Sequence, residues 1–164
     1  MIRAAEPGDV GAIVGLIGDL AEYERARHEV QIDGPALDAA LFGPAPAVFA
    51  HVAVVDGEVV GFALWFLSFS TWLGRHGIYM EDLYVRPEHR GDGHGRALLA
   101  TLARIAVERG YGRLEWAVLD WNEPALAFYR ALGAVALDEW TVHRLTDDAL
   151  RGVAAQADRY HPGP

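Results

Sequence analysis

The 164-residue sequence contains neither cysteine nor lysine, and each absence removes a class of function. Without cysteine the chain can form no disulfide and no thiolate metal site, a composition that suits the reducing cytoplasm. All fourteen basic residues are arginine, so a P-loop, which requires a Gly-Lys pair, is excluded. The net charge of −9 argues against a general nucleic-acid surface, and we therefore expect no nucleic-acid partner.

Long apolar runs are also missing from the sequence. The longest, around residues 59–69, falls far short of the roughly 20 residues that a bilayer span needs. Near the N-terminus, Glu6, Pro7, Gly8 and Asp9 interrupt any apolar signal-peptide segment. We therefore expect a cytoplasmic protein without a membrane partner. Its length fits one domain that spans residues 1–164.

Hydrophobic periodicity and turn residues predict the element order β-α-α-β-β-β-α-β-α-β. The expected strands cover residues 2–4, 48–55, 58–70, 77–85, 114–119 and one or two segments within 134–145. The expected helices cover residues 9–24, 36–42, 93–108, 122–132 and 147–157. This order indicates an α/β fold in which an antiparallel hairpin, turning at Asp56-Gly57, leads into one βαβ crossover. It excludes a doubly wound dinucleotide fold, whose helices would alternate with strands throughout.

The most informative segment is residues 79–98, where an aromatic-rich strand runs into a glycine loop and a helix. Glu81 and Asp82 lie inside the strand, where acids are disfavoured. Residues 90–95 fit the pattern Arg/Gln-x-x-Gly-x-Gly and form a locally basic loop in an acidic chain. Free N–H groups at the helix start would bind an anion such as phosphate, although an ordinary tight βα turn is the alternative at this point. A Rossmann fingerprint is excluded, because Arg96 stands where it requires glycine.

Several segments resemble the Gcn5-related N-acetyltransferases (GNAT), in particular the branch of spermidine/spermine (diamine) and thialysine acetyltransferases. They are Glu22-Tyr23-Glu24, Met80-Glu81-Asp82-Leu83-Tyr84-Val85, the glycine loop at residues 90–95, and residues 120–124 and 127–134. The resemblance covers essentially the whole chain. It implies the GNAT (acyl-CoA N-acyltransferase) fold, with a central mixed, mostly antiparallel sheet that is splayed at the cofactor site and flanked by helices. It also implies an N-acetyltransferase, an acyltransferase of the EC 2.3.1 class, with acetyl-CoA as co-substrate.

The resemblance further implies roles for individual residues. Strand backbone groups should bind the pantetheine arm and the glycine loop should hold the pyrophosphate. The expected cofactor-binding residues are Leu83, Tyr84, Val85, Arg90, Gly91, Asp92, Gly93, His94, Gly95, Arg96, Asn122 and Pro124. The hydroxyl of Tyr129 should protonate the leaving CoA thiolate, and Glu81 should accept the amine proton through water. Considered without the family, Tyr129 beside Phe128 would more often be a core aromatic.

The implied acceptor is a primary amine of a small molecule, which attacks directly in a ternary complex. The expected substrate-binding residues are Tyr23, Glu24, Glu81, Asp82, Trp116 and Glu139. Polyamine enzymes carry an acid before the loop tryptophan, where this chain has Ser70-Thr71 before Trp72. This departure leaves two acceptor classes open: a diamine or polyamine, and an amino acid with a side-chain amine such as thialysine or lysine. Asp82 also has a plainer interpretation as a solvated acid, since neighbours in a strand alternate faces.

Two other functions stay open on the residues alone. A non-catalytic acyl-CoA-binding or sensor domain would keep the loop, but the presence of Glu81 and Tyr129 argues against it. A nucleotide-binding interaction domain is disfavoured by the failed fingerprints. The seven histidines show no His-x-x-x-His spacing on one helix, so we expect no metal. The resemblance also implies a homodimer that builds the substrate site across its interface.

Overall fold

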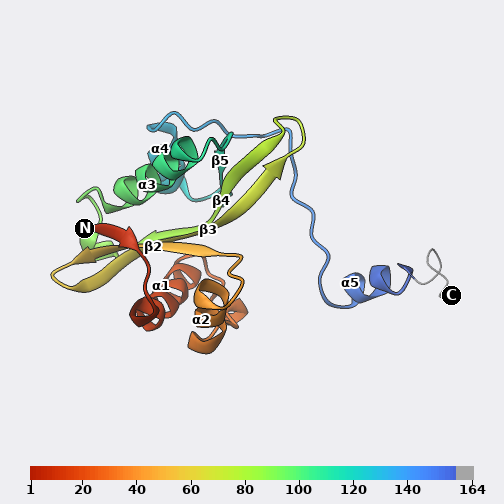
Figure 1. Cartoon of the computed structure of the whole chain (residues 1–164), viewed down its shortest axis with the longest axis horizontal. Coiled ribbons are helices and arrows are strands. Elements are labelled where there is room, and N and C mark those ends of the chain that lie inside the picture. The colour runs from red at the N-terminus through yellow and green to blue at the C-terminus, as the bar shows by residue number, and fades with distance from the viewer. Residues whose placement is uncertain (158–164) are drawn as a thin grey trace. The chain divides into compact units, whose positions relative to one another are not determined.

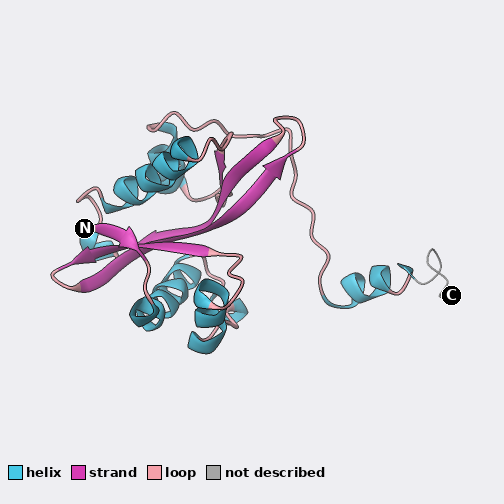
Figure 2. Cartoon of the chain, viewed as in Figure 1, coloured by secondary structure: helices cyan, strands magenta, loops and turns pink. Residues whose placement is uncertain are grey.

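The computed structural model describes residues 1–157, and the chain falls into two compact units, Met1–Ala117 and Val118–Pro164. Figures 1 and 2 show the elements of both units. The first unit holds β1 (Ile2–Ala4), α1 (Val10–Tyr23), α2 (Gly34–Phe42), β2 (Phe49–Val55), β3 (Glu58–Ser70), β4 (Arg75–Val85), α3 (His94–Glu108) and β5 (Leu114–Glu115). The second unit holds α4 (Glu123–Arg130) and α5 (Asp147–Ala154).

The first unit is built on a five-stranded sheet with the order β1-β2-β3-β4-β5. The first three neighbouring pairs are antiparallel and β4 with β5 is parallel, so the expected mixed, mostly antiparallel sheet is confirmed. The β2–β3 hairpin turns at Asp56 and Gly57, whose φ angles of 49° and 87° are both positive. Those angles match a primed two-residue turn, which twists in the same sense as the strands it joins. The expected hairpin is therefore confirmed.

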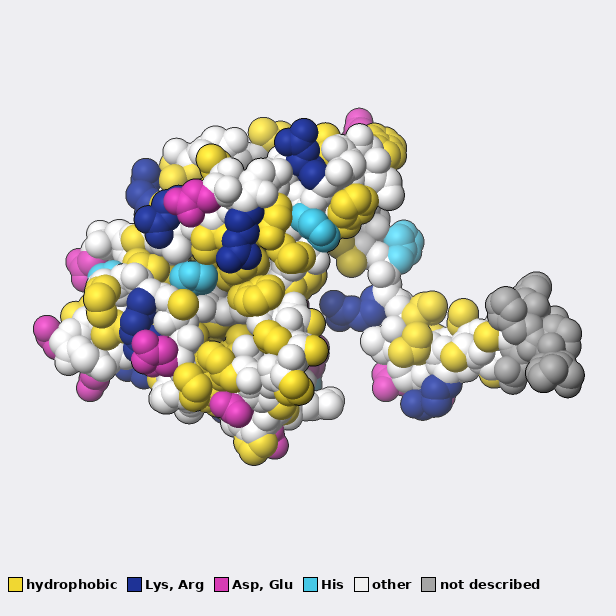
Figure 3. Space-filling model, in the orientation of Figure 1, with side chains coloured by type: hydrophobic (Ala, Val, Ile, Leu, Met, Phe, Trp, Pro, Cys, Tyr) yellow, Lys and Arg dark blue, Asp and Glu magenta, His cyan; other side chains and the backbone are white. Residues whose placement is uncertain are grey.

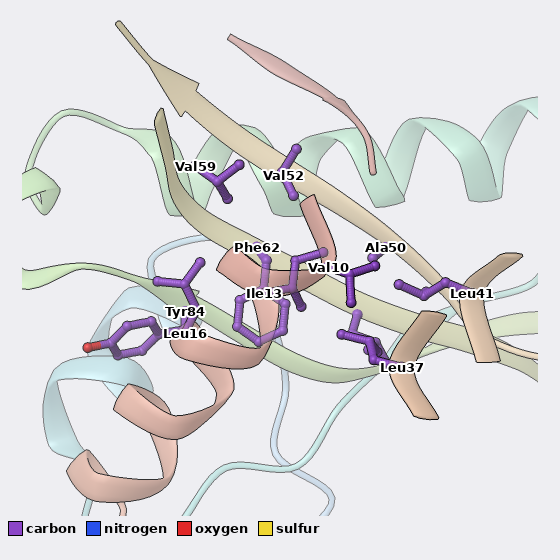
Figure 4. Close-up of a cluster of buried hydrophobic side chains, with 11 residues drawn as sticks. Val10, Ile13, Leu16, Leu37, Leu41, Ala50, Val52, Val59, Phe62 and Tyr84 are labelled. Carbon is purple, nitrogen blue, oxygen red and sulfur yellow. The ribbon is translucent and has the colours of Figure 1, made fainter. Parts of the chain in front are cut away.

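Helices cover both faces of this sheet: α1 and α2 lie on one face and α3 on the other (Figure 1). On the first face, Ile13 and Leu16 of α1 pack with Phe62 of β3, and all three are fully buried (Figure 4). On the other face, Leu98 and Leu102 of α3 are fully buried, at a spacing that places them on one side of the helix. Burying such side chains contributes about 1.5–3 kcal/mol each, which makes the sheet a firm support for the loops at its edge.

Two sequence-based expectations for the end of the chain are wrong. No strand forms in the described part of the second unit, residues 118–157, although strands were expected within residues 134–145. Apolar alternation gives a segment strand propensity, but a strand also needs a neighbour that completes its hydrogen bonds, and the described chain supplies none to this segment. The strand expected over residues 114–119 ends at Glu115, where its pairing with β4 stops.

The expected helices form with small shifts at their ends. The helix expected to reach residue 132 ends at Arg130, and the last helix ends at Ala154 instead of residue 157. Residues 158–164, which belong to the expected single domain, lie outside the described part. Within residues 1–157, no helix combines the length and the apolar character that crossing a membrane requires.

Candidate active site

The two strand acids lie at an irregularity of β4. In the pairing of β3 with β4, Leu64 faces Asp82 and Trp65 faces Met80, so Glu81 is one extra residue on β4. Such a β-bulge bends its strand and re-aims the side chains beside it. The side chain of Glu81 is exposed and that of Asp82 is half-buried, while Tyr84, two residues further on, is buried in the core that α1 covers. Asp82 and Tyr84 share a strand face, which directs Asp82 toward the α1 side of the sheet.

The carboxylate of Asp82 lies near those of Glu81 and Glu24. Burial, followed by the negative charges of Glu81 and Glu24, raises the pKa of Asp82 to about 6. Burial also raises the pKa of Glu24, which follows the last residue of α1. A carboxylate pays for burial and for like-charged neighbours when it ionises, and a bound cation would relieve both costs. The arrangement therefore fits a positively charged ligand such as an alkylammonium group.

The edge of β4 that faces β5 is open beyond its first residues. Among residues 1–117, the pairing of these two strands covers only Ile78 and Tyr79 of β4. The N–H of Arg86 donates to the carbonyl of Val60 at 2.9 Å, and the antiparallel alternation then directs the groups of Tyr84 toward β3 and those of Leu83 and Val85 toward the open edge. Leu83 therefore presents both backbone groups, and Val85 its N–H, to an extended ligand, whereas Tyr84 presents neither; the carbonyl of Val85 accepts from Arg90.

The glycine loop follows this edge directly. Gly91 and Gly93 have φ angles of 93° and 85°, values that only glycine adopts without cost, and Gly93 is the N-cap of α3. The first hydrogen bond of the helix runs from the N–H of Ala97 to the carbonyl of Gly93, at 2.9 Å. The N–H groups of the three residues before Ala97 therefore have no partner within the helix, which makes its N-terminus an anion-binding position.

Arg90 is the first residue of the glycine motif, and its side chain contacts β4 and α1. Its Nε donates to the carbonyl of Val85 at 2.9 Å. Its guanidinium carbon lies 5.4 Å from the ring centre of Tyr23 and 5.3 Å from that of Tyr84. These contacts tie the loop to the end of β4 and to α1. The side chain thus supports the loop, and an anion bound by the loop would meet backbone groups first.

A cleft of about 410 Å³ lies beside this anchor, between the end of α1 and the segment after β4. It is lined by Asp19, Glu22, Tyr23, Tyr84, Arg86, Pro87, Glu88 and Arg90. Sequence reasoning named Tyr23, Tyr84 and Arg90 and missed the other five. The spacing of Asp19, Glu22 and Tyr23 along one helix face was the available signal, because residues three and four apart are neighbours on a helix surface.

The second unit carries its own expected site residues. The side-chain oxygen of Asn122 accepts a hydrogen bond from the N–H of Ala125 at 3.4 Å, so the buried Asn122 caps α4. Pro124 lies in the first turn of that helix, a position that suits its fixed φ. Tyr129 is half-buried in α4, with its ring 5.1 Å from that of Phe128. Of the other expected residues, Trp116 in the first unit is half-buried and Glu139 in the second is exposed.

One group of side chains was not anticipated. His89, Asp92 and His94 each bring a potential ligand atom to within 4.8 Å of the others. The sequence search considered histidines four residues apart on a helix and therefore missed the spacing His-x-x-Asp-x-His, which a loop brings together.

The raised pKa of Asp82 gives a prediction for stability. Asp82→Asn increases the free energy of unfolding at pH 7 by about 1–2 kcal/mol. A shift of two pKa units corresponds to roughly 3 kcal/mol, and the expected gain is smaller because solvent screens the half-buried carboxylate. The folded chain holds the Asp82 proton up to about pH 6 and the unfolded chain only up to about pH 4, so stability falls as the pH rises between these values. The gain therefore vanishes at pH 3.5. Urea unfolding at pH 7 and at pH 3.5 measures this effect, and Asp38→Asn, which changes an exposed acid, serves as the control. An Asp82→Asn chain that is less stable than the wild type at pH 7 would contradict the prediction.

Comparison with known proteins identifies the class to which this fold and this site belong. The sequence model of the acetyltransferase (GNAT) family matches residues 14–134. The chain belongs to that family, and the expected fold and N-acetyltransferase class are confirmed. Members of the family use acetyl-CoA.

Individual relatives place the chain more closely within the family. It is 42% identical to the thialysine N-epsilon-acetyltransferase of Bos taurus, an alignment that covers 95% of this chain and 98% of the relative. It is 32% identical to the L-ornithine N5-acetyltransferase of Arabidopsis thaliana, covering 93% and 86% respectively. Among solved structures, an integron cassette protein from the mobile metagenome of V. cholerae superposes with a TM-score of 0.78, at 27% identity and with coverage of 94% and 96%.

Proposed function

We propose that this protein transfers the acetyl group of acetyl-CoA to a primary amine of a small molecule, by direct attack in a ternary complex. The observation that carries the proposal is the bulged acid pair on β4, which stands beside an open strand edge and just before an anion-binding helix start. An acetyl-CoA molecule offers an amide-bearing arm that can pair with a strand edge and a pyrophosphate that suits a helix N-terminus. The proposal places the amine at these acids, beside the thioester.

The proposed cofactor site follows from this order along the chain. Leu83 and Val85 pair with the pantetheine arm through their backbone groups, and Tyr84 contributes its ring to the wall. The loop from Arg90 to Arg96 holds the pyrophosphate, mainly through the N–H groups that precede Ala97. From the second unit, Asn122 and Pro124 are proposed to contact the CoA arm, a role that rests on the family resemblance. The bound co-substrate supplies an activated acetyl group, and the protein positions it.

Two residues are proposed to move protons. An alkylamine with a pKa near 10.4 is almost fully protonated at pH 7, so the neutral nucleophile costs about 4–5 kcal/mol. Glu81 removes that proton through water, which frees the nitrogen lone pair to attack the carbonyl carbon. As the carbon–sulfur bond breaks, the hydroxyl of Tyr129 donates its proton to the departing sulfur, whose thiol has a pKa near 8.5. The nitrogen loses its second proton to solvent after the attack, and Tyr129 regains a proton from solvent, so the products are the acetylated amine, CoA and one net proton.

The acceptor site is proposed to consist of Tyr23, Glu24, Glu81, Asp82, Trp116 and Glu139. The negative charges of Glu24 and Glu81 near Asp82 support a cationic acceptor. The names of the relatives narrow its chemistry, since thialysine and ornithine are amino acids with a side-chain amine. A relative with 29% identity is a human spermidine/spermine N(1)-acetyltransferase-like protein, which keeps diamines and polyamines as the second acceptor class.

We also propose that residues 1–164 form one functional domain and that two copies form a homodimer in the cytoplasm. The match of the family model, which spans residues 14–134 and therefore both compact units, supports the single domain. Exposed apolar side chains in the second unit support the dimer: Val135 is 83%, Trp140 72% and Val142 81% exposed. Figure 3 shows hydrophobic side chains along one side of α5, where Leu150 and Val153 are half exposed. Light scattering that finds only the monomer mass would exclude this dimer.

An acetylation screen tests the proposed function. The full chain is incubated with acetyl-CoA and each of thialysine, lysine, ornithine, putrescine, spermidine and an aminoglycoside, and CoA release is measured. We expect turnover with at least one acceptor that carries a primary alkylamine, with the highest kcat/KM for a side-chain amine of an amino acid. Binding of acetyl-CoA without turnover on any acceptor would favour the sensor domain instead.

A further inference from the structure

We propose that His89, Asp92 and His94 form a binding site for a divalent transition-metal ion on the glycine loop. His89 ends the short helical turn Pro87–His89, and His94 is the first residue of α3. Each offers one imidazole nitrogen and Asp92 offers a carboxylate oxygen, and all these atoms lie within 4.8 Å of one another. The loop thus gathers three metal-binding side chains from six consecutive residues.

The backbone conformation brings these side chains together before any ion binds. Gly91 and Gly93 flank Asp92, and their positive φ angles of 93° and 85° fold the loop back on itself. The backbone N–H of His89 donates to the carbonyl of Arg86 at 3.0 Å, and the two imidazole rings lie edge to face, with centroids 6.4 Å apart and planes at 66°. A site whose ligands converge in advance costs less ordering on binding than one assembled from a flexible chain.

The donor set determines the class of ion. Two imidazole nitrogens and one carboxylate oxygen suit Zn²⁺, Co²⁺, Ni²⁺ or Cu²⁺, whereas Mg²⁺ and Ca²⁺ prefer oxygen ligands alone. Zinc–ligand bonds of about 2.0–2.2 Å place neighbouring ligands about 3.3–3.5 Å apart, so the ligand atoms need to close by at most roughly 1.4 Å when the ion enters. Both histidines are half-buried and Asp92 is exposed, which leaves a path from solvent.

The charge of the three ligands favours such an ion. The side chain of Arg90, the cation nearest in sequence to Asp92, is occupied by the carbonyl of Val85 and by the rings of Tyr23 and Tyr84. With neutral histidines, the three ligands carry one negative charge, and a divalent ion converts this to one positive charge. Three protein ligands also leave a coordination position open for water or an anion, as in zinc sites that bind a further group. This inference departs from the sequence-based expectation of no metal.

The site does not depend on the proposed acetyl transfer, because it is tested by metal binding without acetyl-CoA. The untagged full chain is stripped with chelator, transferred to chelator-free buffer and titrated with Zn²⁺ in a calorimeter. We expect one ion per chain at this site. His89→Gln and His94→Gln should each weaken binding at least about tenfold, and the double variant should abolish it. Titration with Co²⁺ should produce visible absorption bands of a low-coordinate site, which the double variant lacks.

Matched controls make the result specific. His28→Gln removes a histidine that lies 3.8 Å from the carboxylate of Glu29, a comparable pair outside the loop, and should leave the affinity for Zn²⁺ unchanged. Asp92→Asn alters only the exposed third ligand and should weaken binding about tenfold, which keeps the test available if the histidine variants do not fold. Absence of a one-to-one site in the wild type, or equal Zn²⁺ affinity in the double variant, would overturn the proposal.

Discussion

Glu81→Gln lowers kcat/KM for the amine by about 10²- to 10⁴-fold at pH 7, the range over which a positioned general base acts. Glutamine keeps the size and the hydrogen-bonding reach of the side chain but cannot accept a proton. The effect is large because Glu81 is the extra residue of the β4 bulge and its exposed side chain can reach the proton through water. Asp82 is half-buried, so it is less well placed than the exposed Glu81 to pass a proton through water.

The pH dependence separates this role from a structural one. Deprotonated amine becomes abundant as the pH approaches 10, so the deficit of Glu81→Gln shrinks steadily with rising pH. Rates of CoA release across a pH series measure this, and thermal unfolding verifies the fold. Glu58→Gln, which changes an exposed acid at the start of β3, serves as the matched control and keeps the wild-type profile. Equal kcat/KM for Glu81→Gln and the wild type at pH 7 would assign the base elsewhere.

The first unit follows closely from local signals in the sequence. Asp56-Gly57 specified its hairpin, because few residue pairs tolerate two positive φ angles. Gly91 and Gly93, two positions apart between a strand and an amphipathic helix, indicated the anion-binding loop. These features depend on backbone preferences of a few adjacent residues, and such preferences are legible in a single sequence.

Features that depend on distant partners were not predictable in the same way. The bulge at Glu81 arises from the register of β4 against β3, and no residue type near Glu81 predicts its position. Arg90 was expected to face the pyrophosphate, yet its side chain contacts Val85 and two tyrosines that other elements supply. The raised pKa of Asp82 likewise requires burial by other elements and the charge of Glu24. Each of these is a property of packing, which the sequence encodes only through the fold.

The segment at residues 134–145 shows the opposite error, in which a correct local preference produced a wrong element. Its alternating apolar residues favour a strand, but Val135, Trp140 and Val142 stay exposed and unpaired with any strand of the described chain. Strand propensity measures how well a side chain fits a half-buried pleated surface, so it predicts a strand only where a surface exists. A second copy of the chain is the partner that we propose for this segment.

Tyr129→Phe lowers kcat by about 10²-fold, the low end of the range for acid catalysis, while KM for acetyl-CoA changes little. A thiolate whose conjugate acid has a pKa near 8.5 leaves fairly well without help, so the benefit of a donor is smaller than for an alkoxide or an amide. Phenylalanine keeps the ring that lies 5.1 Å from Phe128 and removes only the hydroxyl, so α4 should retain its packing. The variant therefore tests proton donation while it keeps this ring contact.

The matched control for this variant is Tyr111→Phe, which removes a hydroxyl from a half-buried ring 6.0 Å from His76 and should leave kcat unchanged. Steady-state rates with acetyl-CoA and the best acceptor of the screen supply kcat and both KM values. If Tyr129 acts as the acid, combining Tyr129→Phe with Glu81→Gln costs less than the product of the single effects, because one proton transfer becomes limiting once the other is slow. Unchanged kcat in Tyr129→Phe would leave the thiolate to be protonated by water and would reduce Tyr129 to a packing residue of α4.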